Sequence, residues 1–166
     1  MTRNRKIGRR FALASLLIAG AALPGCDSDP VGVETGLTPE VAQALERAIQ
    51  DEYKAETVYL RVLADHGDVV PFSNIVNAEE RHSQSLAAVF VRHDLAVPLS
   101  EWNLNNVPRF DTVTEACAAG VQAEIENIEM YDELFALPLP ADVATVFQNN
   151  RSASVNRHLP AFEACS

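Results

Sequence analysis

The sequence predicts an all-α protein, a four-helix bundle with one long crossover between its second and third helices. Apolar residues recur at three- and four-residue intervals in four segments after residue 37, and strand-type alternation is almost absent. Short turns join the first two segments and the last two, whereas residues 96–111 form a long connection. One long connection among short ones is typical of a bundle with a crossover that passes along its helices. The length of 166 residues suits one such domain.

The first predicted helix begins at Pro39 and ends near His66. Thr38 suits the N-cap, Pro39 suits the first helical position, and Gly67 suits the position that follows the last turn. One broad face of this helix carries Val41, Leu45, Ile49, Glu52, Glu56, Tyr59 and Leu63. The face that should enter the core therefore includes acidic residues.

The second predicted helix begins after Pro71 and runs to about Leu95. Its inner face carries Ile75, Glu79, His82, Leu86 and Val89. The connection that follows contains Pro98 and Pro108 and lacks helical periodicity. We expect its single tryptophan, Trp102, to hold this crossover against the bundle.

The third predicted helix begins near Asp111 or Thr112, with Thr114 as an alternative N-cap, and Pro138 and Pro140 end it. Its inner face carries Cys117, Val121, Glu124, Ile128, Tyr131 and Phe135.

The fourth predicted helix begins near Asp142 and runs to the end of the chain. Its inner face carries Phe147, Arg151, Val155, His158, Phe162 and Cys165. Pro160 falls inside this span, where a proline removes a hydrogen bond and clashes with the preceding turn. We therefore expect Pro160 to bend the helix or to end it early.

Residues 1–26 resemble a bacterial signal peptide. A basic stretch precedes the apolar run of residues 11–23, which is too short to serve as a mature membrane span. Residues 23–26 resemble a lipobox, which predicts lipidation of Cys26 and a membrane anchor there; ordinary cleavage after a small residue is the alternative. Residues 27–37 would be a tether and residues 38–166 the bundle. The protein should then be exported, either periplasmic or a membrane-anchored lipoprotein, and Arg9–Arg10 leaves Sec and twin-arginine export both open.

The charge distribution excludes nucleic acid as a partner. The formal net charge is −10, and five basic residues lie before residue 11. The remaining chain is more acidic still, whereas binding to phosphates requires clustered lysine and arginine side chains.

Ionisable residues lie where the helical stripes should be apolar. They are Glu52, Glu79, His82, Glu124 and His158. Burying an ionised carboxylate without a partner is very unfavourable, and carboxylates on facing helices repel one another. A bound cation removes both problems. The pattern therefore indicates either a metal site or a mistaken assignment of the inner face.

The spacing of these residues favours the metal site. Glu79 and His82 lie three residues apart, so both point the same way from one helix, although such a pair is also common on surfaces. Tyr59 follows Glu52 by seven residues, and Tyr131 follows Glu124 by the same interval. The repeated pair indicates an internal duplication of a helical hairpin, although each tyrosine alone suits an ordinary core aromatic equally well.

The positions of the turns give an independent check. Residues 52 and 82 are equidistant from residue 67, and residues 124 and 158 are equidistant from residue 141; both midpoints fall at predicted turns. Each antiparallel hairpin should therefore place its glutamate and histidine at one level. Cys117 lies seven residues before Glu124, and Cys165 lies seven after His158, so we predict a disulfide between them; two buried free thiols are the alternative.

Over residues 38–164 the chain resembles the ferritin, bacterioferritin and rubrerythrin superfamily. The motifs that carry the resemblance are Glu52-x6-Tyr59, Glu79-x-x-His82, Glu124-x6-Tyr131 and a late His158. The runs 51–59, 72–82 and 158–162 are most similar to a bacterial branch of ferritin-like domains of unknown function. The resemblance implies a ferritin-like bundle in which carboxylates and histidines hold two iron ions, while Tyr59 and Tyr131 orient the carboxylates.

One position departs from that superfamily. The fourth helix usually carries Glu-x-x-His, but the residue three before His158 is Val155, which cannot bind metal. Five of the six usual ligands remain, and we expect them to divide unequally between the two ions. Ser154, Asn156 or water would then complete the coordination of the second ion.

Three functions stay open. The first is an exported redox protein whose paired iron ions react with oxygen or peroxide. The same donors would also bind manganese or zinc, and the site could hold one ion instead of two. The second is a metal-storage, metal-sensing or interaction module with a degenerate site, which Val155 favours. The third is a structural bundle with internal salt bridges. The expected partners are metal ions and, through Cys26, a membrane; a homodimer is also open.

Overall fold

The computed structural model describes residues 36–166, and the predicted all-α class is confirmed because these residues form helices and no strand. The predictions of a signal peptide at residues 1–26 and of lipidation at Cys26 lie outside the described residues, as does most of the tether. The helices are α1 (Pro39–His66), α2 (Phe72–Arg92), α3 (Val113–Leu134), α4 (Ala141–Ala153), the π-helix η1 (Ser154–His158) and α5 (Leu159–Glu163). No helix within residues 36–166 combines the length and the hydropathy that a membrane span requires.

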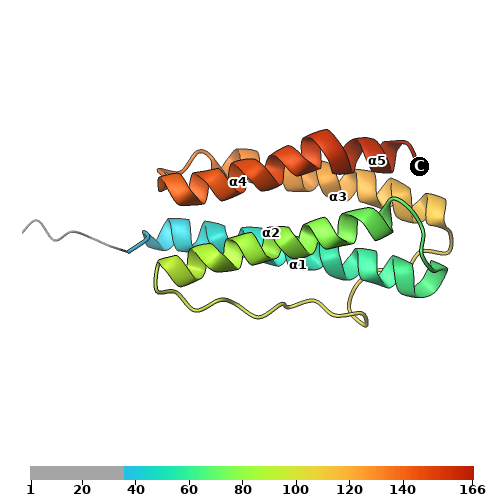
Figure 1. Ribbon diagram of the computed structural model, residues 1–166, viewed down its shortest axis with the longest axis horizontal. Coiled ribbons are helices and arrows are strands. Elements are labelled where there is room, and N and C mark those ends of the chain that lie inside the picture. The colour runs from blue at the N-terminus through green and yellow to red at the C-terminus, as the bar shows by residue number, and fades with distance from the viewer. Residues whose placement is uncertain (1–35) are drawn as a thin grey trace, which may run out of the picture. The chain divides into compact units, whose positions relative to one another are not determined.

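Two antiparallel hairpins make up the helical part of the chain. α1 and α2 form the first hairpin, and α3 pairs with a continuous rod of α4, η1 and α5 in the second (Figure 1). The connection from α2 to α3, residues 93–112, runs along the outside of the first hairpin for most of its length (Figure 1). α1 packs against α3, and α2 packs against α4. Four helical rods therefore face a common interior.

Local sequence signals set the helix ends. The Thr38 hydroxyl accepts a hydrogen bond from the Val41 N–H at 3.3 Å, and Gly67 ends α1 with a φ of +82°. This left-handed conformation is one that glycine adopts without strain. Thr112, rather than Asp111 or Thr114, caps α3. α2 ends at Arg92 rather than near Leu95.

The fourth rod continues through Pro160, so one of the two expected effects of this proline, an early end of the helix, is wrong. In the π-turn η1, the Leu159 N–H bonds to the Ser154 carbonyl, five residues back. Pro160 then falls in the first turn of α5, where its missing N–H is not required. The change of register also turns His158 toward the interior, where it is 3% exposed.

Two apolar clusters fill the interior. The first includes Leu45, Ile49, Leu86, Val89, Tyr131 and Phe147. The second includes Tyr59, Val62, Phe72, Ile75, Cys117 and Phe162. The predicted disulfide is confirmed next to the second cluster, where the Cα atoms of Cys117 and Cys165 lie 5.7 Å apart.

Candidate metal centre

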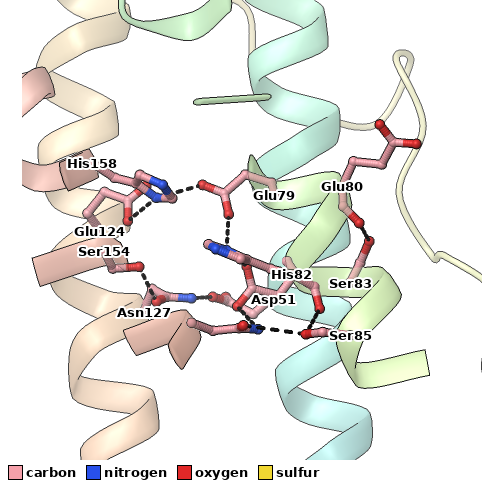
Figure 2. Close-up of polar contacts among 12 residues, drawn as sticks. Asp51, Glu79, Glu80, His82, Ser83, Ser85, Glu124, Asn127, Ser154 and His158 are labelled. Carbon is pink, nitrogen blue, oxygen red and sulfur yellow. Dashed lines mark hydrogen bonds and ion pairs between the residues drawn. The ribbon is translucent and has the colours of Figure 1, made fainter. Parts of the chain in front are cut away.

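Buried ionisable side chains from all four rods meet in the interior. Glu52 of α1, Glu79 of α2 and Glu124 of α3 are 1%, 2% and 3% exposed. His82 of α2 and His158 of η1 lie beside them. In Figure 2 the Glu79 carboxylate lies between the two imidazoles. The structure thus brings together all five side chains that the sequence analysis selected as ligands.

These side chains form two groups that share Glu79. In the first group, Nδ1 of His82 lies 2.9 Å from Oε2 of Glu79 and 3.2 Å from Oε2 of Glu52. In the second group, Nδ1 of His158 lies 3.0 Å from Oε1 of Glu79 and 3.5 Å from Oε2 of Glu124. Within each group the candidate ligand atoms all lie within 4.8 Å of one another. Each oxygen of Glu79 therefore faces a different histidine.

The two groups are equal in composition, which differs from the unequal division expected from Val155. Each group has two carboxylates and one imidazole. The reason is that Glu79 belongs to both groups, while Val155 is only partly buried and Ser154 occupies the inner face beside it. The Ser154 hydroxyl donates to Oδ1 of Asn127 at 2.8 Å, and Asn156 is exposed and donates to Ser152.

The two tyrosines bond across the bundle to the glutamates. The Tyr59 hydroxyl donates to Oε1 of Glu124 at 2.8 Å, and the Tyr131 hydroxyl donates to Oε1 of Glu52 at 2.5 Å. Burial and the nearby carboxylates hold the pKa of both tyrosines well above 10, so both remain donors at neutral pH. Each tyrosine fixes one oxygen of a glutamate and leaves the other oxygen directed at a histidine.

Amides around the centre were not identified from the sequence. Asn150 donates to Oε1 of Glu52 at 3.3 Å and to the Tyr131 hydroxyl at 3.2 Å. Asn127 donates from Nδ2 to Oδ2 of Asp51 at 2.8 Å. The available signal was the four-residue spacing from Asn150 through Ser154 to His158, which marks one helix face.

The predicted inner positions of Arg151 and Val155 are wrong. Arg151 forms a bidentate pair with Asp132, with distances of 2.7 Å and 2.8 Å. Its guanidinium is therefore satisfied outside the centre and does not neutralise the buried glutamates. The inner face of this rod continues instead through Asn150 and Ser154, both of which are 3% exposed.

The ionisation of the centre follows from burial and close contacts. Burial alone lowers the pKa of a histidine, but contacts with Glu52 and Glu79 raise the pKa of His82 to about 9. Contacts with Glu124 and Glu79 likewise raise the pKa of His158 to about 10, against the effect of burial. Burial raises the pKa of Glu52. In the protein without metal, two imidazolium ions therefore offset the charge of the carboxylates.

The donor set fits transition-metal ions. Oε1 of Glu79 and Nδ1 of His158 are buried and make no hydrogen bond of good geometry within residues 36–166, although they lie 3.0 Å apart. Buried polar atoms in folded proteins nearly always have a partner. An ion bound between these two atoms would satisfy both. Carboxylate oxygen together with imidazole nitrogen suits iron, manganese and zinc.

Comparisons of this chain with protein-family models, with curated proteins and with solved structures find no match. What the chain does is therefore inferred from the residues of the centre and their geometry.

Proposed function

We propose that this chain is an exported ferritin-like bundle whose interior binds two metal ions, with iron as the expected metal. The observation that supports this most strongly is the position of Glu79. Its two oxygens lie 2.9 Å from His82 and 3.0 Å from His158, and each histidine lies beside one further glutamate. A carboxylate between two equivalent donor groups is suited to bridge two cations.

The architecture agrees with a ferritin-like bundle. Two helical hairpins are joined by one long crossover, and equivalent glutamate–tyrosine pairs stand on α1 and α3. In bundles of this class, inward-pointing glutamates and Glu-x-x-His pairs build di-metal sites. Glu79 and His82 provide one such pair, and the π-turn brings His158 to the equivalent place in the second hairpin.

Each residue has a defined role in the proposed centre. Glu52 and His82 would hold one ion, Glu124 and His158 would hold the other, and Glu79 would bridge them. Tyr59 and Tyr131 would orient the terminal glutamates through the hydrogen bonds described above. Bound iron would supply redox chemistry with oxygen or peroxide. The protein would supply a dry, charge-balanced interior and, from the two imidazolium groups, protons that are released as metal binds.

Metal content tests the proposal directly. The wild-type protein refolded with Fe(II) and desalted should contain two equivalents of iron by mass spectrometry. The Glu79→Ala variant should lose both ions because the bridge is shared. Glu80→Ala is the matched control, since Glu80 is exposed on the same helix and should not change the metal content. One equivalent or less in the wild type, unchanged in Glu79→Ala, would contradict the proposal.

A non-catalytic, charge-paired bundle is the second candidate. The observation in its favour is that His82 and His158, with pKa values raised to about 9 and about 10, offset the buried glutamates without metal. Peroxide consumption separates the candidates: an iron-loaded oxidase or peroxidase turns over, whereas a storage or sensing module does not. Melting that is independent of metal would favour a purely structural bundle.

Export is proposed from residues 1–26 and agrees with the disulfide. Cys117 and Cys165 are paired within the described residues, and disulfides persist in oxidising compartments. Lipidation at Cys26 would anchor the bundle to a membrane through the predicted tether of residues 27–37. Mass spectrometry of the membrane fraction should find a lipid-modified cysteine at the mature N-terminus.

A further inference from the structure

A cavity of about 240 Å³ lies between α1 and α3 and reaches the candidate metal centre. Tyr59, Glu79 and Glu124 form part of its wall, and Pro108 and Phe110 of the crossover line it as well. An engineered apolar cavity of about 150 Å³ holds benzene. The cavity beside the centre is larger, so it has room for an organic molecule with one ring.

Small side chains create this cavity. Ala55 of α1 and Ala119 and Ala123 of α3 face it, where larger side chains would fill the space between the two helices. Protein interiors are normally packed to high density, and an unfilled cavity lowers stability. Such a space next to a cluster of buried carboxylates and histidines is a typical location for a ligand.

The wall of the cavity combines an apolar surface with a few acceptors. Val58 and Phe110 provide apolar contact area. Asp51 provides an acceptor near the centre, because its Oδ2 accepts the hydrogen bond from Asn127 at 2.8 Å and its Oδ1 is left for a ligand. An amine or hydroxyl group of a bound molecule would therefore find its acceptor at Asp51.

Charge selects the kind of molecule that fits. The acidic residues of the lining are Asp51, Glu79, Glu124 and Glu126, and its basic residue is Lys54. The Lys54 ammonium lies over the Trp102 ring, 5.6 Å from its centroid, and so is engaged with the crossover. His82 and His158 offset Glu79 and Glu124, so Asp51 and Glu126 set the charge of the lining against Lys54 alone. A lining with this balance favours cationic and neutral molecules over anions.

We propose that the cavity binds a small organic molecule with an apolar body of about one ring and an amine or hydroxyl group, which it holds by Asp51 next to Glu79 and Glu124. Binding itself depends only on the cavity. The role of this molecule as the substrate of the metal centre rests on the proposed function.

Three fluorinated probes of one size test the proposal on the purified protein without added metal. They are 4-fluorobenzylamine, 4-fluorobenzyl alcohol and 4-fluorobenzoate, and their binding is followed by fluorine NMR. We expect saturable binding of the amine and the alcohol at one site, and binding of the benzoate about tenfold weaker or absent, a difference of about 1.4 kcal/mol. No saturable binding of any probe, or binding of the benzoate as tight as that of the amine, would overturn the proposal.

Variants locate the binding site. Ala123→Leu should fill the cavity and weaken binding of the amine and the alcohol at least about tenfold. Ala118→Leu is the matched control, because Ala118 is exposed on the same helix and does not line the cavity. Asp51→Asn should weaken binding of the amine more than binding of the alcohol. This variant serves as the test if Ala123→Leu does not fold. Equal affinities in the wild type and in all three variants would overturn the proposal.

Iron content of the same protein preparations, measured after refolding with Fe(II), separates the two proposals. Iron bound to the wild type without any response of the probes would overturn the cavity proposal and leave the metal centre standing. Probe binding that Ala123→Leu abolishes, in a protein that takes up no iron, would support the cavity site and contradict the proposed metal function.

Discussion

The hydroxyl of Tyr59 on α1 donates a hydrogen bond of 2.8 Å to Oε1 of Glu124 on α3. The equivalent bond runs the other way, from Tyr131 on α3 to Glu52 on α1. Each helical hairpin thus supplies the tyrosine that orients the glutamate of the other. The seven-residue spacing of glutamate and tyrosine reflects this exchange, because it puts each tyrosine two turns beyond the glutamate of its own helix.

Tyr59→Phe should lower both the free energy of unfolding and the affinity for metal. The substitution leaves a buried oxygen of Glu124 without its donor, which costs about 1–3 kcal/mol in the metal-free protein. Loss of an orienting partner should also reduce metal affinity by about 10–100-fold. Urea unfolding and metal titration measure the two effects. Tyr53→Phe is the control, since Tyr53 lies partly exposed on the same helix; equal effects of both substitutions would exclude the orienting role.

The metal-free protein should lose stability as the pH rises from about 6.5 to 10. The pKa values of His82 and His158 are raised in the folded protein to about 9 and about 10, from 6.5. The stability that the two protonated histidines contribute to the folded protein is therefore fully present below pH 6.5. It is lost as the pH rises through 9 to 10. The melting temperature across this range measures it. A His82→Gln/His158→Gln variant should show a flatter dependence, and identical slopes would contradict the assignment.

Metal affinity should change with pH in the opposite direction. Metal binds the neutral imidazoles, so binding displaces the protons that His82 and His158 hold at neutral pH. Affinity should rise between pH 7 and 9. Calorimetric titration with Zn(II) in two buffers of different ionisation enthalpy measures the protons released. Binding without proton release at pH 7 would indicate that these histidines are not ligands.

Removal of the disulfide should destabilise the bundle without emptying the centre. Cys117 and Cys165 are 48 residues apart in sequence, and closing a loop of that length stabilises by about 4 kcal/mol in the chain-entropy model. Cys117 lies two turns from Glu124, so a Cys117→Ala/Cys165→Ala variant should keep its iron at low temperature. Guanidinium unfolding and iron content report the two properties separately. Unchanged stability would show that the bond does not constrain the unfolded chain.

Gly120→Ala should destabilise the protein although alanine is the better helix former. A Cβ atom at Gly120 would lie 2.6 Å from Cδ1 of Phe162, and this ring is packed against Tyr59 and Phe72. Overpacking of this kind costs about 1–3 kcal/mol, more than the gain of up to about 1 kcal/mol in helix propensity. Phe162→Leu should cost less stability in the Gly120→Ala background than in the wild type. A rise in thermal stability on Gly120→Ala would contradict this packing.

The first three helices could be predicted from the sequence because their apolar stripes keep one period. Glu52, Glu79 and Glu124 fall on those stripes, and burial of ionisable groups there was the signal for the centre. The equal heights of glutamate and histidine followed from the turn positions alone, as did the pairing of Cys117 with Cys165.

The inner face of the fourth rod could not be predicted because its period changes inside the segment. Spacings of four, four and three residues connect Phe147 to His158 through Arg151 and Val155. The inner face instead has spacings of three, four and four through Asn150 and Ser154, and the last of these steps is the π-turn. Polar residues at those positions look like surface residues until the register is known. The cavity could not be predicted from the sequence either, because it depends on the separation of α1 and α3 where small side chains meet.

Anomalous diffraction at the iron edge, from a crystal grown with Fe(II), tests the metal centre most directly. Two peaks should lie on either side of the Glu79 carboxylate, one near His82 and Glu52 and one near His158 and Glu124. A map without a peak within coordination distance of Glu79, from protein whose glutamates keep these positions, would show that the buried charges are balanced by the histidines alone.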